Sequence, residues 1–407
     1  MISVTKAKSL VLKNSFTFGV VKLPLEKALG LTLAEDVFAL NDVPSFTNSA
    51  MDGYAVKSKQ TKAATKDNPL ALKLIGSVKA GSFAKQILKN KEAIKIMTGA
   101  PLPKGADSVV IKEDTFEEYG KVLVKKEVKP GENVRFQGEE IKKGDLALRK
   151  FTVLNPAALG FLATIGIKRV KVFKPPVITI IATGDELVTS SEKLTFGQIY
   201  DSNSVSLKAA LKECGIDPVN ILKSPDDLTG LQKTLSKAIQ NSDIVLISGG
   251  ISVGDYDYVK KILKSLKVKE IFWKVAQKPG KPLYFGKQGQ VLVFGIPGNP
   301  AACLVVFYEY IRPAILKSMG RKEISLPTIK GKLSKTLKKN QGLSYFWRGK
   351  LNGNSHPPTV TISEKQGSHM LQTFALGDCL IIGPENITEI KKNSLVEVHL
   401  LPWRNKL

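Results

Sequence analysis

Residues 243–257 read Asp-Ile-Val-Leu-Ile-Ser-Gly-Gly-Ile-Ser-Val-Gly-Asp-Tyr-Asp, an apolar run followed by a glycine-rich loop with two acids. The run at 243–248 is typical of a strand buried on both faces, and residues 258–266 have a helical pattern. Between a strand and a helix, consecutive glycines let backbone N–H groups close on an anion. A tight turn without a ligand is the alternative, but the serine hydroxyl and the acids favour a binding site. The candidate residues are Gly249, Gly250, Ser252, Gly254 and Asp257.

The loop differs from the two common nucleotide motifs. It lacks the lysine and hydroxyl of GxxxxGK[ST], and it lacks the spacing of GxGxxG. The sequence therefore argues against an NTP-driven motor and against a dinucleotide-binding fold.

Strand and helix patterns alternate on both sides of this stretch. Strands are expected at 176–182 and 290–295, and helices at 204–213, 231–240 and 301–317. This alternation predicts a three-layer α/β domain with a mostly parallel sheet over residues 174–322. Ligands of such sheets bind beyond the carboxyl ends of the strands. The Pro297-Gly298-Asn299 turn follows the strand at 290–295 and is expected at this edge of the sheet.

The two flanking regions have other patterns, as expected for a chain of 407 residues that exceeds one core. Residues 1–173 combine short strand-like runs with Gly/Pro turns, which predicts an elongated β-rich arm with an inserted β-rich subdomain at about 52–138. Residues 323–407 contain short strands separated by turns, which predicts a small C-terminal β-barrel.

The net charge of +25 raises the question of nucleic-acid binding. Only seven of the 61 basic residues are arginine, and the lysines are scattered along the chain without interleaved aromatic residues. Because nucleic-acid recognition favours arginine, we expect a solvated lysine-rich surface that attracts anionic substrates and no nucleic-acid partner.

The remaining composition excludes further classes of protein. The three cysteines form no CxxC pair and the three histidines have no metal-binding spacing, so a disulfide framework or a zinc site is not expected. No apolar run reaches 18 residues, and the first residues lack the features of a secretory signal. We expect a cytoplasmic protein without a membrane partner.

Residues 277–282, Gln-Lys-Pro-Gly-Lys-Pro, place two ammonium groups on one proline-stiffened turn. Such a turn holds Lys278 and Lys281 ready for an anion at low entropic cost. Two exposed loop lysines without a ligand are the alternative. The position of the turn inside the α/β region favours a site.

Acids occupy three further loops of the same region. Glu186 lies in Thr-Gly-Asp-Glu-Leu, Asp201 precedes a predicted helix, and Asp226 and Asp227 precede another. Each aspartate alone is more simply explained as a helix cap. Gathered at one sheet edge beside lysines, the acids would hold a divalent cation that bridges a phosphate.

The arm carries polar segments around Asp52, Thr98, Arg135 and Glu140. From the residues alone, these are only candidates for an exposed polar site.

These segments resemble, in order, the signatures of the molybdopterin molybdenumtransferase family, which includes bacterial MoeA-type enzymes and the E domain of gephyrin. The matching stretches are NSAMDGYAV, MTGAPLP, TGDEL, YDSNS, SGGISVGDYDY, KPGKP and GIPGNPAACL. The resemblance covers nearly the whole chain. It implies an elongated homodimer in which the arm of one subunit completes the active site of the other.

The resemblance also implies the reaction. The family inserts molybdate into adenylylated molybdopterin with a divalent cation, Mg²⁺, and releases AMP and molybdenum cofactor. The resemblance also implies a separate molybdopterin adenylyltransferase as a partner. The residues implied as catalytic are Asp52, Thr98, Glu186, Asp226, Asp227, Asp257, Lys278 and Lys281. Those implied in ligand binding are Gly249, Gly250, Ser252, Gly254, Asp201, Pro297, Gly298, Asn299, Arg348 and Ser368. Those implied at the cation are Asp52, Glu186, Asp257 and Glu140.

The sequence departs from the family pattern at a few positions. Thr47 and Glu140 stand where the family usually has aspartate, and Ala301 or Ala302 stands where serine is frequent. A hydroxyl contact to molybdate is therefore missing or replaced, and Glu140 reaches one methylene further.

Two other functions compete with this interpretation. A nucleotide hydrolase of the competence-damage type shares the central domain but lacks the arm, so residues 40–140 argue against it. A scaffolding protein that keeps the fold without turnover, as gephyrin does when it clusters receptors, is disfavoured by the intact acids and lysines.

Overall fold

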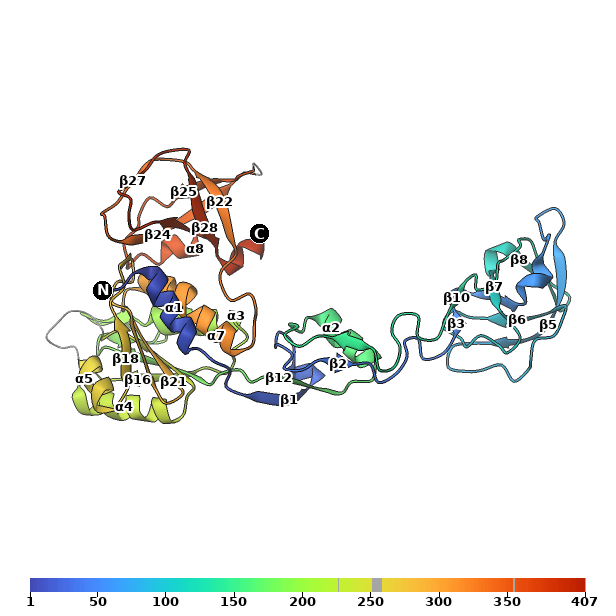
Figure 1. The fold of residues 1–407 in the computed structure, drawn as a ribbon, viewed down its shortest axis with the longest axis horizontal. Coiled ribbons are helices and arrows are strands. Elements are labelled where there is room, and N and C mark those ends of the chain that lie inside the picture. The colour runs from blue at the N-terminus through green and yellow to red at the C-terminus, as the bar shows by residue number, and fades with distance from the viewer. Residues whose placement is uncertain (226, 251–257, 354–355, 407) are drawn as a thin grey trace. The chain divides into compact units, whose positions relative to one another are not determined.

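The structure is a computed structural model that describes residues 1–406 except 226, 251–257 and 354–355. The chain forms two compact units, drawn in Figure 1. The first contains Met1–Val21, Gly30–Ala34 and Lys171–Leu407; the second contains Lys22–Leu29 and Glu35–Val170. No helix among the described residues is long and apolar enough to cross a membrane.

A six-stranded sheet forms the centre of the first unit. In spatial order its strands are β16 (Asn220–Ser224), β13 (Ile178–Thr183), β17 (Ile244–Ser248), β21 (Val291–Ile296), β20 (Tyr284–Gln288) and β18 (Lys269–Trp273). The first four run parallel, and β20 and β18 add an antiparallel edge. Every residue of β13 and of β17 is buried, as expected for strands covered on both faces. The prediction of a mostly parallel sheet is confirmed.

Helices cover both faces of this sheet. Helices α4 (Leu228–Gln240) and α5 (Tyr258–Ser265) pack together over one face, in a core that includes Leu235, Val245 and Ile262. Figure 1 shows α3 (Ser202–Glu213) on the other side, where it contacts β13 and α6. The predicted three-layer α/β domain is thereby confirmed.

The predicted helix at 301–317 is not one regular α-helix. It consists of α6 (Pro300–Val306), a π-helical turn at Phe307–Ile311 (labelled η4) and α7 (Arg312–Ser318). Pro313, near the start of α7, has no backbone N–H to continue the α-helical ladder, and the wider turn lies directly before it. The apolar pattern could not show this change because every residue of Phe307–Ile311 is buried.

A helix that the sequence analysis did not predict opens the chain. Helix α1 (Val4–Asn14) is capped by Ser3, whose side chain accepts from the backbone N–H of Lys6. It contacts α7 and the π-helical turn and buries Ala7 and Val11. The first residues therefore belong to the same unit as the central sheet.

The predicted C-terminal β-barrel is confirmed. Strands β22 (Thr328–Leu333), β24 (Ser344–Asn352), β25 (Thr359–Ile362), β26 (Cys379–Gly383) and β28 (Leu395–Leu400) close on themselves through the β24–β26 pairing. The short strand β19 (Gln277–Lys278) pairs parallel with β24, so the lysine turn is hydrogen-bonded to the barrel.

The second unit is β-rich, as predicted. Its main sheet contains, in spatial order, β7 (Ser108–Ile111), β4 (Gly53–Val56), β6 (Glu92–Ile96), β5 (Leu70–Val78), β9 (Lys121–Val124) and β8 (Thr115–Glu118). Apolar clusters cover both faces of β4, with Tyr54 in one and Ala55 in the other.

Candidate functional site

Two neighbouring cavities lie in the first unit where the parallel strands end. The sheet-end cavity follows β13, β17 and β21, and the barrel-side cavity lies between the lysine turn and the barrel. Each measures about 670 Å³, which is the size of a small-molecule site. Pro282, Pro297, Asn299 and His369 line both, so one ligand can extend from one cavity into the other.

Backbone groups form much of the sheet-end cavity. Gly249 and Gly250 follow β17, and Gly298 follows β21. The buried side-chain amide of Asn203, on α3, donates to the Ser248 hydroxyl at 2.9 Å and to the Gly298 carbonyl at 2.7 Å. This amide ties the two loops together, so their backbone groups are held in place before a ligand arrives. Asn203 was not among the candidates, although it lies in the quoted YDSNS stretch.

The conformation at Gly249 requires glycine, whereas that at Gly298 does not. Gly249 has φ +94°, and an added Cβ would lie 2.8 Å from the Thr183 hydroxyl; at Gly298 the nearest atom would be 3.7 Å away. We expect Gly249→Ala to lower the free energy of unfolding by about 2 kcal/mol and Gly298→Ala to change it by less than about 0.5 kcal/mol. Urea unfolding curves of both variants check this, and equal losses would contradict it.

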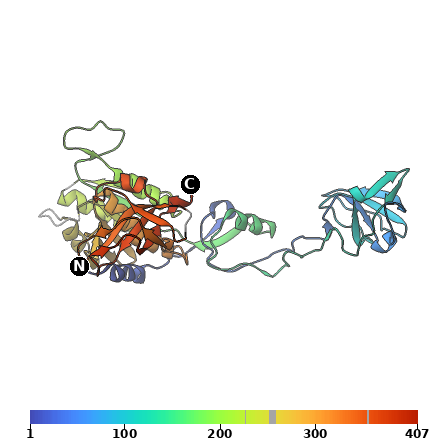
Figure 2. The same cartoon turned by 90° about the horizontal axis from the view of Figure 1, so that it is seen from above.

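Two acids reach the sheet-end cavity from a pair of short strands. Glu186 precedes β14 (Leu187–Val188), and Asp201 follows β15 (Ile199–Tyr200). The strands are joined by a loop at 189–198 that projects from the unit in Figure 2. The Glu186 carboxylate folds back over Gly184, where a Cβ would lie 2.5 Å from its oxygen.

The aspartates at helix starts act as caps. Asp201 accepts from the backbone N–H of Ser204 at 3.0 Å at the start of α3 while also lining the cavity. Asp227 accepts from the N–H groups of Thr229 and Gly230, both at 2.9 Å, and it does not line either cavity. Asp227 therefore acts as a helix cap, which is the explanation that the sequence favoured for each aspartate taken alone.

The lysine turn and the barrel supply three cations to the barrel-side cavity: Lys278, Lys281 and Arg348. Pro279 and Gly280 are buried, whereas the two lysines on either side of them are exposed. The Lys278 ammonium lies 5.6 Å from the centre of the Tyr345 ring. Among the described residues, neither lysine has an ion-pair partner, so both are available to an anion.

Arg348 is unusual because its charge is buried without a carboxylate among the described residues to balance it. The side chain is 1% exposed and donates to the Thr373 hydroxyl at 2.9 Å and to the Gly367 carbonyl at 2.8 Å. Burial lowers its pKa to about 10, which still leaves the guanidinium charged at neutral pH. A buried cation with only neutral partners is electrostatically suited to an anionic ligand.

Ser368 lines the barrel-side cavity, and His369 lies where the two cavities meet. The Asn299 amide donates to the Ser368 hydroxyl oxygen at 3.0 Å, which leaves the hydroxyl proton free for a ligand. His369 lines both cavities. It was not predicted because a lone histidine outside any recognisable motif gives no signal of a site. Gln366, which lines the barrel-side cavity and binds the Arg348 backbone, was also missed.

The candidates in the second unit lie partly together. Asp52 accepts from Thr98 twice, from the backbone N–H at 2.7 Å and from the hydroxyl at 2.8 Å. These hydrogen bonds hold the pKa of Asp52 below its ordinary value. The Glu140 backbone N–H donates to the Val43 carbonyl at 2.9 Å, and the residue is exposed. Within the described part of the chain, no hydrogen bond joins Glu140 to Asp52 or Thr98.

Four candidates, Asp226, Ser252, Gly254 and Asp257, lie outside the described residues. In the part of the chain that is described, no cluster of three acid, histidine or cysteine side chains has metal-binding geometry. The sheet-end cavity still holds the carboxylates of Glu186 and Asp201. Two carboxylates fit Mg²⁺ that takes its other ligands from phosphate oxygens and water.

Family models match most of the chain. Three family models match in order: the MoeA N-terminal region (domains I and II) at residues 2–166, a probable molybdopterin binding domain at 179–317 and the MoeA C-terminal region (domain IV) at 330–401. The central sheet and most of the sheet-end cavity lie in the region matched by the probable molybdopterin binding domain, whereas the barrel-side cavity also takes residues from the region matched by MoeA domain IV. The match at 2–166 covers the arm, which the competing hydrolase lacks.

Relatives that match along nearly the whole chain identify the family more specifically. Molybdopterin molybdenumtransferases of Staphylococcus aureus strain Mu50 and of Staphylococcus epidermidis are each 34% identical, over 98% of this chain and 95% of theirs. A crystal structure of a molybdopterin biosynthesis MoeA protein from Pyrococcus horikoshii has a TM-score of 0.82 at 33% identity, over 98% of this chain and 99% of the other. The chain belongs to the molybdopterin molybdenumtransferase family.

Proposed function

We propose that this protein inserts molybdate into adenylylated molybdopterin and releases AMP. The observation that carries the proposal is the pairing of the two cavities, one formed by backbone groups and acids and the other by three cations. Two substrates, one carrying a phosphoanhydride and the other an oxyanion, must meet at one point in this reaction. Such a pair fits the two joined cavities better than a single small substrate does.

The barrel-side cavity would bind molybdate. Lys278, Lys281 and Arg348 would balance its two negative charges, and the free proton of the Ser368 hydroxyl would donate to one oxygen. Because the turn is stiffened by its prolines and Arg348 is held by two hydrogen bonds, the cations are oriented before the anion binds. Alanine at 301 and 302, where the family often has serine, does not change the charge of this cavity because serine is also neutral.

The sheet-end cavity would bind the phosphates of the adenylylated pterin. The loops after β17 and β21, with Gly249, Gly250 and Gly298, present backbone groups that can approach phosphate oxygens closely. Glu186 and Asp201 would hold Mg²⁺, which supplies positive charge at the phosphoanhydride. The four candidates outside the described residues, Asp226, Ser252, Gly254 and Asp257, would complete this half of the site.

Asp52 and Thr98 would come from the arm of a second subunit in a homodimer. This part of the proposal rests on the family, together with the hydrogen-bonded geometry of the pair. Thr98 favours the ionised form of the Asp52 carboxyl group, which is the form that binds a cation. Glu140 would lie near the same cation, and a molybdopterin adenylyltransferase would supply the substrate.

The direct test is to incubate the protein with adenylylated molybdopterin, Mg²⁺ and molybdate and to follow AMP release. We expect AMP release that depends on molybdate. A protein that releases no AMP, or releases it at the same rate without molybdate, would contradict the proposal.

Asp52 gives a residue-level test of the same proposal. We expect Asp52→Asn, which keeps an acceptor for Thr98 but removes the charge, to reduce the rate of AMP release at least 100-fold. Asp42→Asn is the matched control, because Asp42 is another arm aspartate whose pKa is lowered by hydrogen bonds, here from Lys143 and Gln137. Equal rates for the two variants would argue against a role for Asp52.

A further inference from the structure

A buried hydrogen-bond relay holds the lysine turn from behind. The Gln277 side chain, which is 1% exposed, donates from Nε2 to the carbonyls of Pro279 at 3.1 Å and of Gly280 at 3.2 Å. Its Oε1 accepts from the hydroxyl of Tyr310, which is also 1% exposed. The two carbonyls can only accept, which fixes the orientation of the amide and leaves Oε1 for the tyrosine.

The backbone of the turn is shaped around this amide. Gly280 has φ +90°, and a Cβ there would lie 2.6 Å from Gln277 Nε2 and 3.0 Å from the Val306 side chain. The amide therefore occupies space that any other residue at 280 would need. Since the Pro279 and Gly280 carbonyls lie between the two lysines, the relay fixes the segment that sets their spacing.

The relay connects the turn to the rest of the cation cluster. Gln277 and Lys278 form β19, whose partners on β24 are Ser344 and Tyr345, and the same strand carries Arg348 three residues later. Tyr310 lies in the π-helical turn between α6 and α7. The position of the lysines relative to Arg348 thus depends on β24 on one side and on the Tyr310–Gln277 contact on the other.

We propose that Tyr310 and Gln277 are positioning residues for the oxyanion: their relay holds Lys278 and Lys281 at the spacing that lets both meet one anion together with Arg348. The proposal deepens the proposed function and rests on it for the identity of the anion. Tyr310 does not line the barrel-side cavity, and Gln277 lines it with both polar atoms of its side chain already hydrogen-bonded within the relay. Their loss therefore weakens anion binding and leaves the chemistry at saturating anion nearly unchanged.

The test compares Tyr310→Phe with Tyr308→Phe. Tyr308 lies in the same π-helical turn, is also buried and donates to Glu213 on α3 at 2.9 Å, so it has no hydrogen bond to the lysine turn. Two readouts are measured: tungstate binding to the protein alone by calorimetry, and the molybdate dependence of AMP release. We expect Tyr310→Phe to weaken tungstate binding and raise half-saturating molybdate about tenfold, with the maximal rate within about twofold of the unmodified protein. Tyr308→Phe should change neither.

A double-mutant comparison tests whether the two residues act as one unit. We expect Gln277→Leu to weaken tungstate binding more than Tyr310→Phe does, and the double variant to be no weaker than Gln277→Leu alone. Tyr310→Phe with unmodified binding, or additive losses, would overturn the relay. If the unmodified protein binds tungstate and turns over while Tyr310→Phe matches it, only the relay fails. If the unmodified protein neither binds the anion nor releases AMP, both proposals fail.

Discussion

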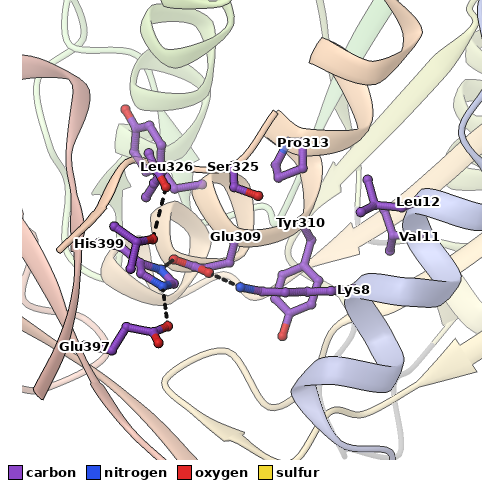
Figure 3. Close-up of a pocket in the computed structure, with 12 residues that line it drawn as sticks. Lys8, Val11, Leu12, Glu309, Tyr310, Pro313, Ser325, Leu326, Glu397 and His399 are labelled. Carbon is purple, nitrogen blue, oxygen red and sulfur yellow. Dashed lines mark hydrogen bonds and ion pairs between the residues drawn. The ribbon is translucent and has the colours of Figure 1, made fainter. Parts of the chain in front are cut away.

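Replacing Glu309 by alanine is expected to lower the free energy of unfolding of the first unit by about 3 kcal/mol. Glu309 is 3% exposed and lies in the π-helical turn. It binds the Lys8 ammonium of α1 and, at 2.7 Å, the His399 ring of β28, as Figure 3 shows. One carboxylate therefore joins the first helix, the central domain and the barrel. Without it, two cationic groups would remain in a small cavity with no buried acid between them.

Glu397 offers the matched control for this substitution. It pairs with the other ring nitrogen of His399 at 3.0 Å, but its side chain is 46% exposed. We expect Glu397→Ala to cost less than about 0.5 kcal/mol. All three tryptophans of the chain, Trp273, Trp347 and Trp403, lie in the first unit, so urea unfolding followed by their fluorescence reports on that unit. Equal losses for both variants would show that burial at Glu309 is not decisive.

The contribution of Glu309 should also depend on pH. Burial alone would raise the pKa of Glu309, but Lys8 and His399 outweigh it and lower the pKa below 4.5; burial alone would lower the pKa of His399, but Glu309 outweighs it and raises the pKa above 6.5. The contribution of the Glu309 carboxylate to stability is present above pH 4.5 and is lost as pH falls through its lowered pKa. The contribution of the His399 imidazolium to stability is complete below pH 6.5 and is lost as pH rises through its raised pKa. The difference between the unmodified protein and Glu309→Ala should therefore be larger at pH 5.5 than at pH 9.

Arg348→Met is expected to weaken tungstate binding at least 100-fold while leaving the first unit as stable as before, or more stable. The guanidinium is buried with no carboxylate partner among the described residues, and burial lowers its pKa to about 10. An apolar side chain of similar length removes this unbalanced charge, which costs stability in the free protein. The same charge is what an oxyanion in the barrel-side cavity would bind, so affinity and stability should change in opposite directions.

Arg321→Met is the control for this variant. Burial also lowers the pKa of Arg321, whose guanidinium donates to the Gly30 carbonyl at 2.7 Å and lines neither cavity. Arg321→Met should therefore keep tungstate affinity. The measurements are calorimetric titration with tungstate and urea unfolding. If Arg348→Met kept its affinity, the barrel-side cavity would not be the oxyanion site.

Most of the central domain could be predicted because its elements bury continuous apolar runs. The predicted strand at 243–248 differs from β17 (Ile244–Ser248) by one residue, and the predicted helix at 258–266 differs from α5 (Tyr258–Ser265) by one. Helix α1 was missed because only Ala7 and Val11 are fully buried and the lysines around them suggest a surface. Its docking on α7 depends on contacts about 300 residues apart, which local patterns do not reveal.

In the candidate site, too, the residues set by local sequence patterns could be predicted, and those set by tertiary packing could not. The glycines after β17 and β21 were expected to meet because parallel strands end at one edge of a sheet, and both loops line the sheet-end cavity. His369 and Gln366 were not found because the barrel brings them to the central domain through tertiary packing alone. The relay from Tyr310 was hidden for a further reason, since a tyrosine in a wholly buried helix resembles any other core residue.

The π-helical turn also constrains the length of the chain between Pro300 and Ser318. Three successive side chains in it bind four different parts of the unit: Tyr308 binds α3, Glu309 binds α1 and the barrel, and Tyr310 binds the lysine turn. A π-turn holds one residue more than the α-helical turn it replaces, so deleting one residue would restore a regular helix and rotate the side chains on one side by about 100°. We therefore expect insertions and deletions in this segment to be tolerated much less than conservative substitutions of its apolar residues.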